Sequence, residues 1–379
     1  MKIMIIGLGQ AGSKIADLFI KDDRKSHIPH TFESIVVNTA VSDLMGLQYI
    51  PREDRILLGE TLLKGHGVGA DNKKASRIAE DEIEIILNKI SKLNVSDFDA
   101  FFVVAGLGGG TGSGSISVVA RHLKEVYDEP VYAIGILPAE NEGDIYTLNT
   151  ARCLKSLLPS CDATILVDNG AFLHSGESVR QAYDRINMEI VKRLGIICRA
   201  GEIRGKNRVG EMIVDASEVI NTLNAGGICS IGYASEAVKR ESFLTKFVKR
   251  KEYEIGKASR VLSVTKRAIK GRLLLPCDYT TSQKALIIIA GPHEQLDRKG
   301  IEKARKWLET TISGTEVRGG DYPLPKSNYV GCVVLLAGIG NAPRVKRMLQ
   351  RARDVQKKIA EEPVKEKDID YLLGDIENL

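Results

Sequence analysis

The chain has 379 residues, a formal net charge of +5 and 43% hydrophobic residues, which is the composition of an ordinary globular protein. Its content of Val, Ile and Leu excludes a chain that is disordered throughout, and no apolar run approaches the roughly 18 residues needed to span a membrane. We therefore expect two or three folded domains and no transmembrane segment.

The first residues lead directly into an apolar strand, without the basic leader or cleavage site that would indicate secretion. Six cysteines are scattered along the chain and form no Cys-x-x-Cys pair. This pattern favours reduced, mostly buried thiols in a cytoplasmic protein and does not favour a zinc site, so we expect no protein-bound metal cluster.

In the first 170 residues, short apolar runs alternate with amphipathic helical patterns. The predicted strands are Lys2–Ile6, Ser34–Asn38, Ala100–Ala105, Val131–Leu137 and Ala163–Val167. The predicted helices between them are Gly12–Ile20, Asn72–Leu93, Ser115–Tyr127 and Tyr146–Leu158. This alternation predicts an α/β fold with a parallel sheet covered by helices on both faces. Ligands of such sheets bind at the carboxyl ends of the strands.

A long helical pattern, Ser178–Leu194, contains neither Gly nor Pro. Glu211–Leu223 follows as a second predicted helix. Farther along, Lys284–Ala290 and Val330–Ala337 are predicted strands, with a helix at Arg298–Thr311 between them. The sequence pattern changes after the second helix, and these two strands with a helix between them indicate a separate, smaller α+β domain.

The predicted organisation therefore has four parts. They are a parallel-sheet domain over residues 1–177, a long central helix with the segment after it over 178–225, a smaller α+β domain over 226–358, and a flexible acidic tail over 359–379. The stretch Lys239–Arg272 holds twelve basic and three acidic residues, whereas Glu361–Leu379 holds seven acidic and two basic ones.

The first predicted strand is followed by a turn, Gly7–Gly12, that matches the pattern G-x-G-x-x-G and opens a helix. Glycine lets the backbone approach a phosphate, and the helix N-terminus supplies free N–H groups and a positive dipole. By itself the pattern indicates a dinucleotide-binding unit. In such a unit the second strand ends in an acid that binds the ribose, but here it ends in Asn38.

A longer glycine loop, Gly106–Gly114, lies between a predicted buried strand and a helix. Six of its nine residues are glycines, which is costly in backbone entropy. Successive N–H groups of such a loop can form an anion-binding nest, and Thr111 and Ser113 add hydroxyl donors. It is not a Walker A loop, because no Gly-Lys-Ser/Thr follows. With a third glycine-rich loop at Lys64–Asn72, the sequence favours a ligand that carries several phosphates.

At Gly108–Gly114 the sequence resembles the GGGTG[ST]G signature of the tubulin/FtsZ superfamily of GTPases, and the order of the other loops agrees over residues 1–340. Within that superfamily it is most similar to the archaeal CetZ branch, tubulin-like proteins linked to control of cell shape. Gln10 is the tubulin-like choice, and the loop 67–72 is the FtsZ-like choice. The resemblance implies a GTP-binding domain over 1–177, GTP/GDP as ligands, Mg²⁺ held mainly by phosphates and water, and head-to-tail filaments.

The resemblance also implies which residues contact the nucleotide. Those expected at the phosphates and the adjoining strand ends are Gly9, Gln10, Ala11, Gly12, Ser13, Lys14, Asn38, Gly69, Ala70, Asp71, Asn72, Gly108, Gly109, Gly110, Thr111, Gly112 and Ser113. Glu142, in a loop that resembles the family's PFxxEG, and Asn169 are expected at the ribose. Tyr183 and Asn187 are four residues apart and share a helix face, which by itself indicates a surface or packing pair. The resemblance implies that the ring stacks on a purine and that the amide pairs with a guanine edge.

Asp215 and Glu218 are three residues apart, which places both carboxylates on one side of the first turn of a helix. By themselves they can be acids stabilised by the helix dipole. The resemblance places them in the family's catalytic loop, where the acids of one subunit orient the water that attacks the nucleotide of the next. Hydrolysis is therefore expected to require assembly.

Two other functions stay open from the residues alone. An NAD(P)-dependent oxidoreductase would use the first glycine turn, but Asn38 and the longer glycine loop count against it. A nucleic-acid-binding protein would use the basic stretches 239–272 and 344–358, which lack interleaved aromatic residues, so no nucleic acid is expected as a partner. The acidic tail, with spaced apolar residues, favours a peptide that docks on a partner protein or a simple solubilising tail.

Overall fold

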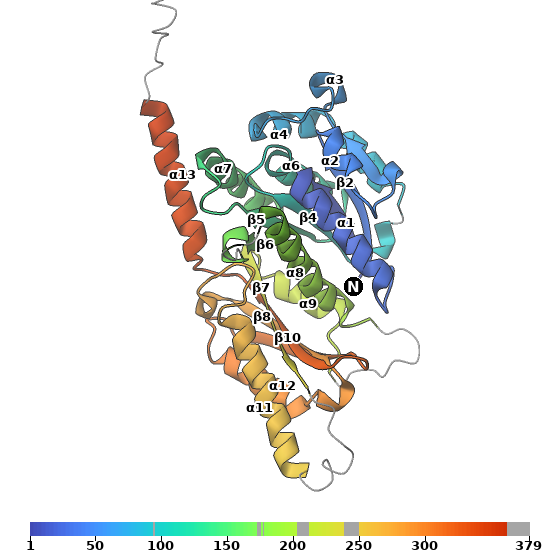
Figure 1. Cartoon of the computed structure of the whole chain (residues 1–379), viewed down its shortest axis with the longest axis vertical. Coiled ribbons are helices and arrows are strands. Elements are labelled where there is room, and N and C mark those ends of the chain that lie inside the picture. The colour runs from blue at the N-terminus through green and yellow to red at the C-terminus, as the bar shows by residue number, and fades with distance from the viewer. Residues whose placement is uncertain (94, 173–175, 177, 203–211, 239–249, 362–379) are drawn as a thin grey trace, which may run out of the picture.

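A single sheet of ten strands runs through the protein in the order β3-β2-β1-β4-β5-β6-β7-β10-β8-β9 (Figure 1). The computed structural model describes residues 1–93, 95–172, 176, 178–202, 212–238 and 250–361. The strands are β1 Ile3–Leu8, β2 Phe32–Asn38, β3 Arg55–Leu57, β4 Ala100–Gly106, β5 Val131–Leu137, β6 Ala163–Asp168, β7 Ile228–Ala237, β8 Lys284–Gly291, β9 Glu316–Pro323 and β10 Tyr329–Ala337.

The helices are α1 Gly9–Lys25, α2 Val41–Met45, α3 Glu60–Leu63, α4 Asn72–Asp81, α5 Ile83–Ile90, α6 Thr111–Val126, α7 Asp144–Ser160, α8 Val179–Arg199, α9 Ala216–Leu223, α11 Arg250–Ile269, α12 Arg298–Glu309 and α13 Pro343–Glu361. Strands β1 to β6 are parallel to their neighbours, which confirms the predicted α/β class with a parallel sheet.

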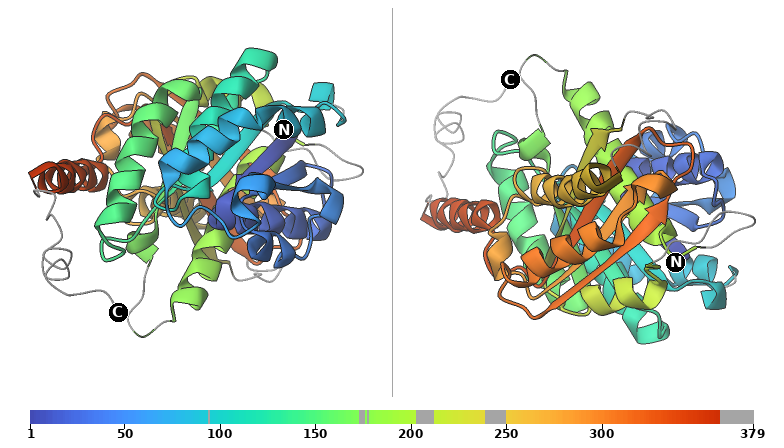
Figure 2. Two further views of the ribbon diagram at one scale, coloured as in Figure 1. Left: turned by 90° about the horizontal axis from the view of Figure 1, so that it is seen from above. Right: turned by 90° about the horizontal axis from the view of Figure 1, so that it is seen from below.

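Helices cover both faces of the parallel part of the sheet, as Figure 2 shows from above and below. On one face, Ile5 of β1 packs with Phe19 of α1 and Ile186 of α8. On the other face, Ile6 belongs to a second core cluster, which includes Ile116 of α6 and residues of α4, α5, α7 and α13. Side chains of successive β1 residues therefore point to opposite faces of the sheet, and every residue of this strand is buried.

The remaining strands continue the same sheet with mixed directions. β7 pairs in parallel with β6 over two residue pairs only, and it pairs antiparallel with β10 over eight. β10 is also antiparallel to β8, and β8 is parallel to β9. Helices α11 and α12 cover one face of these strands, whereas α8 and α9 pack against the other. α8 therefore contributes to the core on both sides of the β6–β7 junction.

Several predicted element bounds are wrong. The predicted helix 72–93 is split at Glu82, whose backbone leaves the helical region at φ −114° and ψ 19° while its carboxylate accepts the Gly59 N–H at 2.8 Å. The helix predicted from Glu211 begins at Ala216. The backbone of Met212 pairs instead with β9: its N–H donates to the Asp321 carboxylate, and its carbonyl accepts the Asp321 N–H.

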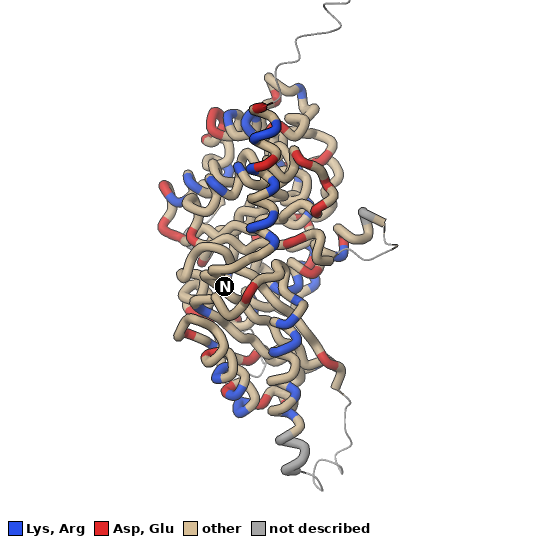
Figure 3. The backbone as a smooth tube through the Cα atoms, turned by 90° about the vertical axis from the view of Figure 1, so that its left-hand side faces the viewer, with Lys and Arg blue, Asp and Glu red and all other residues tan. Residues whose placement is uncertain are grey.

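The basic stretches are mostly helical where the structure describes them, and residues 270–272 are the non-helical part. α11 covers Arg250–Ile269, and α13 covers Pro343–Glu361, so the helix extends three residues into the predicted flexible tail. Figure 3 shows their Lys and Arg residues as blue bands on one side of the molecule. The rest of the predicted tail, 362–379, and residues 239–249 of the basic stretch lie outside the described residues.

Searching the described helices for a membrane span, we find none with the required length and hydropathy. All six cysteines are free thiols, and five of them are buried. Burial raises the pKa of Cys198, Cys229 and Cys332 to about 12, so these groups stay protonated. Across the described ranges, no three His, Cys, Asp or Glu side chains form a group that could hold a metal ion.

Candidate functional site

A cavity of about 1100 Å³ lies where the parallel strands end. It is lined by the residues that directly follow β1, β2, β4, β5 and β6 and by one face of α8. From β1 the sheet continues to β2 and β3 on one side, and from β4 it continues to β5 and β6 on the other. The strand order therefore reverses between β1 and β4. Open α/β sheets bind their ligands at such a topological switch point.

Most of the residues predicted to contact a nucleotide line this cavity. They are Gly9, Gln10, Ala11, Lys14, Asn38, Gly69, Ala70, Gly108, Gly109, Gly110, Thr111, Gly112, Glu142, Asn169, Tyr183 and Asn187. Five others do not line it, namely Gly12, Ser13, Asp71, Asn72 and Ser113.

Of these five residues, Gly12 and Ser113 support the loops from behind. A Cβ at Gly12 would lie 2.0 Å from the carbonyl oxygen of Val104, so glycine is needed there for α1 to pack against β4. The Ser113 hydroxyl donates to the carbonyl of Gly109 and is 2% exposed. These contacts hold the glycine loop in shape and do not face the cavity.

Residues 71 and 72 begin α4. The Asp71 carboxylate caps this helix by accepting the Lys74 N–H at 3.0 Å, while the buried Asn72 amide donates to the carbonyl of Asn149 at 3.3 Å. Ser13 is 1% exposed, and its hydroxyl has no hydrogen-bond partner among the described residues.

The glycines of the loop after β4 serve two different purposes. A Cβ at Gly110 would lie 2.5 Å from a Val68 methyl group, and one at Gly112 would lie 2.9 Å from the Leu8 carbonyl. Those glycines let neighbouring loops approach each other. Gly109 differs, because no described atom lies within 4 Å of a Cβ built there, although the residue lines the cavity. It is the position where the backbone is open to a ligand.

The first turn of α6 points its N–H groups toward the same cavity. The helix begins at Thr111, four residues earlier than predicted, and no side chain caps it. Its first N–H groups therefore have no intrahelical partner and are available to an anion, which the helix dipole also favours. The Thr111 hydroxyl lies 2.7 Å from that of Thr39, which follows β2.

Sequence reasoning missed Asn149, which connects two of the loops. This residue of α7 is 1% exposed, and its amide donates to the carbonyls of Ala70 at 2.8 Å and Gly108 at 3.1 Å. The sequence did offer a signal for this residue, because it lies within a predicted amphipathic helix. A buried amide at such a position requires hydrogen-bond partners.

Asp43 was also missed. It accepts hydrogen bonds from the Gln10 amide at 3.0 Å and the Asn38 amide at 3.1 Å. The end of β2 is thereby tied to the first glycine turn. Asn38 thus lines the cavity with its amide already fixed, and the ribose-binding acid of a dinucleotide site is absent from this position.

Glu142 and Tyr183 meet across the cavity wall. The Tyr183 hydroxyl donates to Glu142 at 3.2 Å, and the same carboxylate oxygen accepts the Ala139 N–H at 2.7 Å. Burial, and then the neighbouring carboxylate, raise the pKa of Tyr183. Asn187, one turn farther along α8, is 9% exposed, and its amide forms no hydrogen bond to any residue that the structure describes. Its donor and acceptor are therefore available to a ligand.

A buried arginine from α13 joins the loops after β5 and β6. Arg344 is 7% exposed and donates to the carbonyl of Pro138 at 2.7 Å and to the Asp168 carboxylate at 3.3 Å. Burial raises the pKa of Asp168, and the guanidinium acts in the opposite direction. The contact fixes the two loops that carry Glu142 and Asn169.

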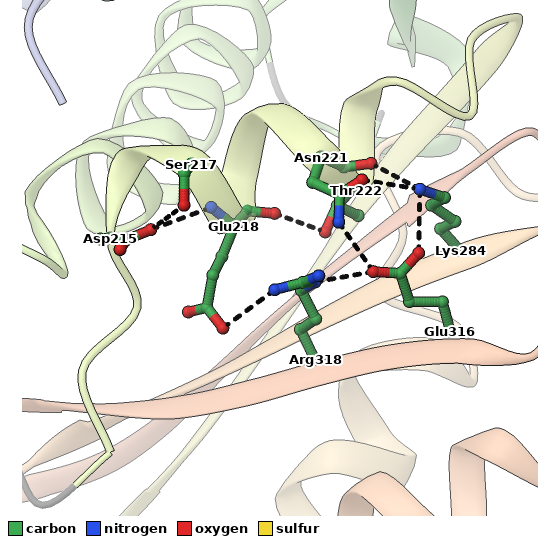
Figure 4. Close-up of polar contacts among 8 residues, drawn as sticks. All are labelled: Asp215, Ser217, Glu218, Asn221, Thr222, Lys284, Glu316 and Arg318. Carbon is green, nitrogen blue, oxygen red and sulfur yellow. Dashed lines mark hydrogen bonds and ion pairs between the residues drawn. The ribbon is translucent and has the colours of Figure 1, made fainter.

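The two predicted catalytic acids lie elsewhere, at the start of α9, as Figure 4 shows. Asp215 is the N-cap of this helix and accepts the Glu218 N–H at 3.0 Å and the Ser217 hydroxyl at 2.6 Å, and these hydrogen bonds lower its pKa. One Glu218 oxygen lies 3.4 Å from Arg318 of β9, while the other is buried without a hydrogen-bond partner among the described residues.

The full length of α8 separates these acids from the cavity. Gly201, just beyond α8, lies against the start of α9, since a Cβ there would be 2.2 Å from the Val214 carbonyl. Eighteen residues of mostly helical chain separate it from Tyr183, or about 27 Å at the helical rise per residue. Neither Asp215 nor Glu218 lines the cavity. The structure thus brings most of the predicted nucleotide-contacting residues together but leaves the two predicted catalytic acids at the opposite end of the helix.

Two family models together match most of this chain. The family model described as "Tubulin/FtsZ family, GTPase domain" matches residues 2–177, and "Tubulin-like CetZ, C-terminal domain" matches residues 176–354. The tubulin-like protein CetZ1 of Haloferax volcanii is 44% identical over 371 residues, which cover 95% of this chain and 94% of that protein.

Two solved structures are also similar. CetZ1 from Haloferax volcanii as a GDP-bound monomer has a TM-score of 0.84 at 44% identity, covering 94% of this chain and 100% of that one. CetZ2 from the same organism, a GTPγS-bound protofilament, has a TM-score of 0.85 at 38% identity and covers 95% and 100%. The chain therefore belongs to the tubulin/FtsZ family of GTPases and, within it, to the CetZ branch of tubulin-like proteins.

Proposed function

We propose that this protein binds and hydrolyses GTP, polymerises head to tail in the cytoplasm, and completes each active site with Asp215 and Glu218 of the adjacent subunit. The observation that carries the proposal is the separation of about 27 Å along α8 between the cavity and the acids. Side chains cannot span that distance within one chain. The related CetZ2 forms a GTPγS-bound protofilament, which supports assembly with bound nucleotide.

The cavity fits a nucleoside triphosphate. Gly109 and the uncapped first turn of α6 offer backbone donors for the phosphates. From the same cavity wall, Glu142 and Asn169 would contact the ribose, and Tyr183 and Asn187 would bind a guanine base. Mg²⁺, held mainly by phosphate oxygens and water, would neutralise the charge that develops in phosphoryl transfer.

The contribution of the acids is to position water. Phosphoryl transfer needs alignment and charge neutralisation more than covalent participation by the protein. A carboxylate from the neighbouring chain can accept a hydrogen bond from the attacking water and hold it in line with the phosphate. The acids reach the phosphates only across an interface, so turnover depends on assembly.

Filaments and the acidic tail would both act in the cell. We propose that the filaments act in the control of cell shape, and that the acidic tail binds a partner protein through its spaced apolar residues. Deleting residues 368–379 should leave GTP turnover and sedimentation of the purified protein unchanged while altering where the protein gathers in cells. Loss of polymerisation on deletion would instead make the tail part of the filament.

A mixing experiment tests the shared active site. Glu218→Ala should bind GTP and assemble, because its own cavity is intact, and its turnover should fall by about 10²–10⁴-fold. Gly109→Val should fail to bind GTP, because its side chain would occupy the open space beside the loop where the phosphates would lie, and a Cβ there meets no described atom within 4 Å. Each variant keeps the part that the other lacks.

Mixing the two inactive proteins should restore turnover, because GTP on a Glu218→Ala chain then faces an intact Glu218 on a Gly109→Val neighbour. Nucleotide binding is measured separately for each variant to verify the design. Wild-type turnover by Glu218→Ala alone would contradict the proposal, and so would a mixture no more active than its components when the two chains sediment together.

A further inference from the structure

β9 presents a row of residues to the catalytic loop. It lies at the edge of the sheet in parallel register with β8, and alternation along a strand puts Glu316, Arg318 and Gly320 on one face. Gly320 lies against the carbonyl of Met212, where a Cβ would approach to 2.4 Å. The strand therefore packs directly on the segment that leads to Asp215.

Arg318 is shared between two carboxylates on this face. Its Nε donates to Glu316 at 2.8 Å, and its Nη1 lies 3.4 Å from the nearer oxygen of Glu218 (Figure 4). Glu316 is held in turn by Lys284 at 2.9 Å and by the Asn221 amide of α9 at 2.8 Å. The guanidinium is thus anchored on one side and turned toward the catalytic acid on the other.

This contact restricts a flexible side chain. An unrestrained glutamate samples several rotamers, and freezing them costs free energy that would add to the barrier of the reaction. Arg318 engages one oxygen of Glu218 and leaves the second without a described partner. That second oxygen is buried within the single chain, and a buried acceptor without a partner is costly, so it still lacks a hydrogen bond that a water molecule at the subunit interface would supply.

We propose that Arg318 is a positioning residue for hydrolysis across the subunit interface: it orients the Glu218 carboxylate toward the neighbouring subunit's water and offsets its repulsion by that subunit's phosphates. The inference rests on the proposed function. Arginine suits this place better than lysine because its planar fork can serve Glu316 and Glu218 at once.

The competing view is an ordinary surface ion pair. Side chains of Arg318 and Glu218 are 34% and 26% exposed, and such pairs contribute about 0–1 kcal/mol to stability. A pair of that kind would leave turnover unchanged when removed. The test therefore needs readouts of hydrolysis that a merely structural contact would not change.

Arg318→Gln should bind GTP and sediment like the wild type, but its turnover per polymerised subunit should fall by about 10- to 100-fold, the scale of a misplaced catalytic group. Arg318→Lys, which keeps the charge, should recover part of the loss. Arg298→Gln is the matched control, because it removes an exposed ion pair with Glu302 on α12, and its turnover should equal that of the wild type.

Coupling to Glu218 is measured in a double variant. If Arg318 acts through Glu218, the variant Glu218→Gln/Arg318→Gln should be no slower than Glu218→Gln alone. A further loss in the double variant would mean that Arg318 acts independently, and it would overturn the proposal. Failure of both Arg318→Gln and Arg318→Lys to assemble would overturn it as well, because the proposed role begins after assembly.

Mixing distinguishes this inference from the function on which it rests. Arg318→Gln mixed with Gly109→Val should regain turnover, because GTP on the first chain faces an intact Arg318 and Glu218 on the second. The mixture of Glu218→Ala with Gly109→Val is run in parallel. Rescue of Glu218→Ala but not of Arg318→Gln would refute only the proposed role of Arg318 and leave the shared active site standing. Rescue of neither variant would refute the shared active site.

Discussion

Tyr183 and Asn187 lie one turn apart on α8, and both line the cavity. Asn187 has an amide that no described residue engages, so it can read the edge of a base. A buried hydrogen-bonding group left unpaired by the wrong base costs about 1–3 kcal/mol, so GTP should bind roughly tenfold to a hundredfold more tightly than ATP.

Replacing Asn187 by Ala should remove most of that preference, as measured by titration with both nucleotides. The exposed Asn88 of α5 supplies a matched control, because Asn88→Ala deletes an amide far from the cavity lining. Equal affinity of the wild type for GTP and ATP would contradict the assignment of the base site.

Local spacing in the sequence was enough to predict most of the residues that line the cavity. The glycine loop could be predicted as a phosphate site, but the sequence could not show that Gly110 and Gly112 serve contacts between loops while Gly109 faces open space. Asn149 and Arg344 escaped notice because their partners lie far away in the sequence, 176 to 206 residues away for Arg344. Such contacts depend on tertiary packing.

Among the elements, buried parallel strands were predictable and edge strands were not. β1 and β4 are nearly continuous apolar runs, as expected of strands covered on both faces. β9 has the sequence EVRGGDYP, with two glycines, a terminal proline and only partial burial, so no strand pattern marks it. Because β9 was not predicted, its contacts with Met212 and Glu218 could not be predicted either.

Helix α13 contributes Arg344, which contacts the two loops expected at the ribose. Arg344→Met would leave the buried Asp168 without its cation, and breaking a buried pair of this kind costs about 3–5 kcal/mol of stability. GDP affinity should also fall by about tenfold, roughly the value of one hydrogen bond. Thermal unfolding and GDP titration measure both effects.

The neighbouring Arg347 provides the control. Its side chain is 65% exposed and meets the exposed Glu140 at 3.5 Å, so Arg347→Met should change stability by no more than about 0.5 kcal/mol. Unchanged GDP affinity in an Arg344→Met protein that remains folded would show that the two loops hold their positions without α13.

For the whole molecule, the strand order could not distinguish the two leading functions. The order β3-β2-β1-β4-β5-β6 is also that of dinucleotide-binding domains, so the oxidoreductase alternative is compatible with the sheet. Family membership excludes it, in agreement with the second glycine loop. The sheet runs without interruption through β7, and the predicted division into domains at residues 177, 225 and 358 stays a prediction.

The central claim concerns the whole molecule, because it holds that one chain contains two halves of an active site at opposite ends of α8. GTP turnover measured against protein concentration tests it most directly. We expect turnover per subunit to be close to zero in dilute solution and to rise steeply above the concentration at which filaments sediment. Turnover that stays strictly proportional to protein concentration down to the fully monomeric range would contradict the account.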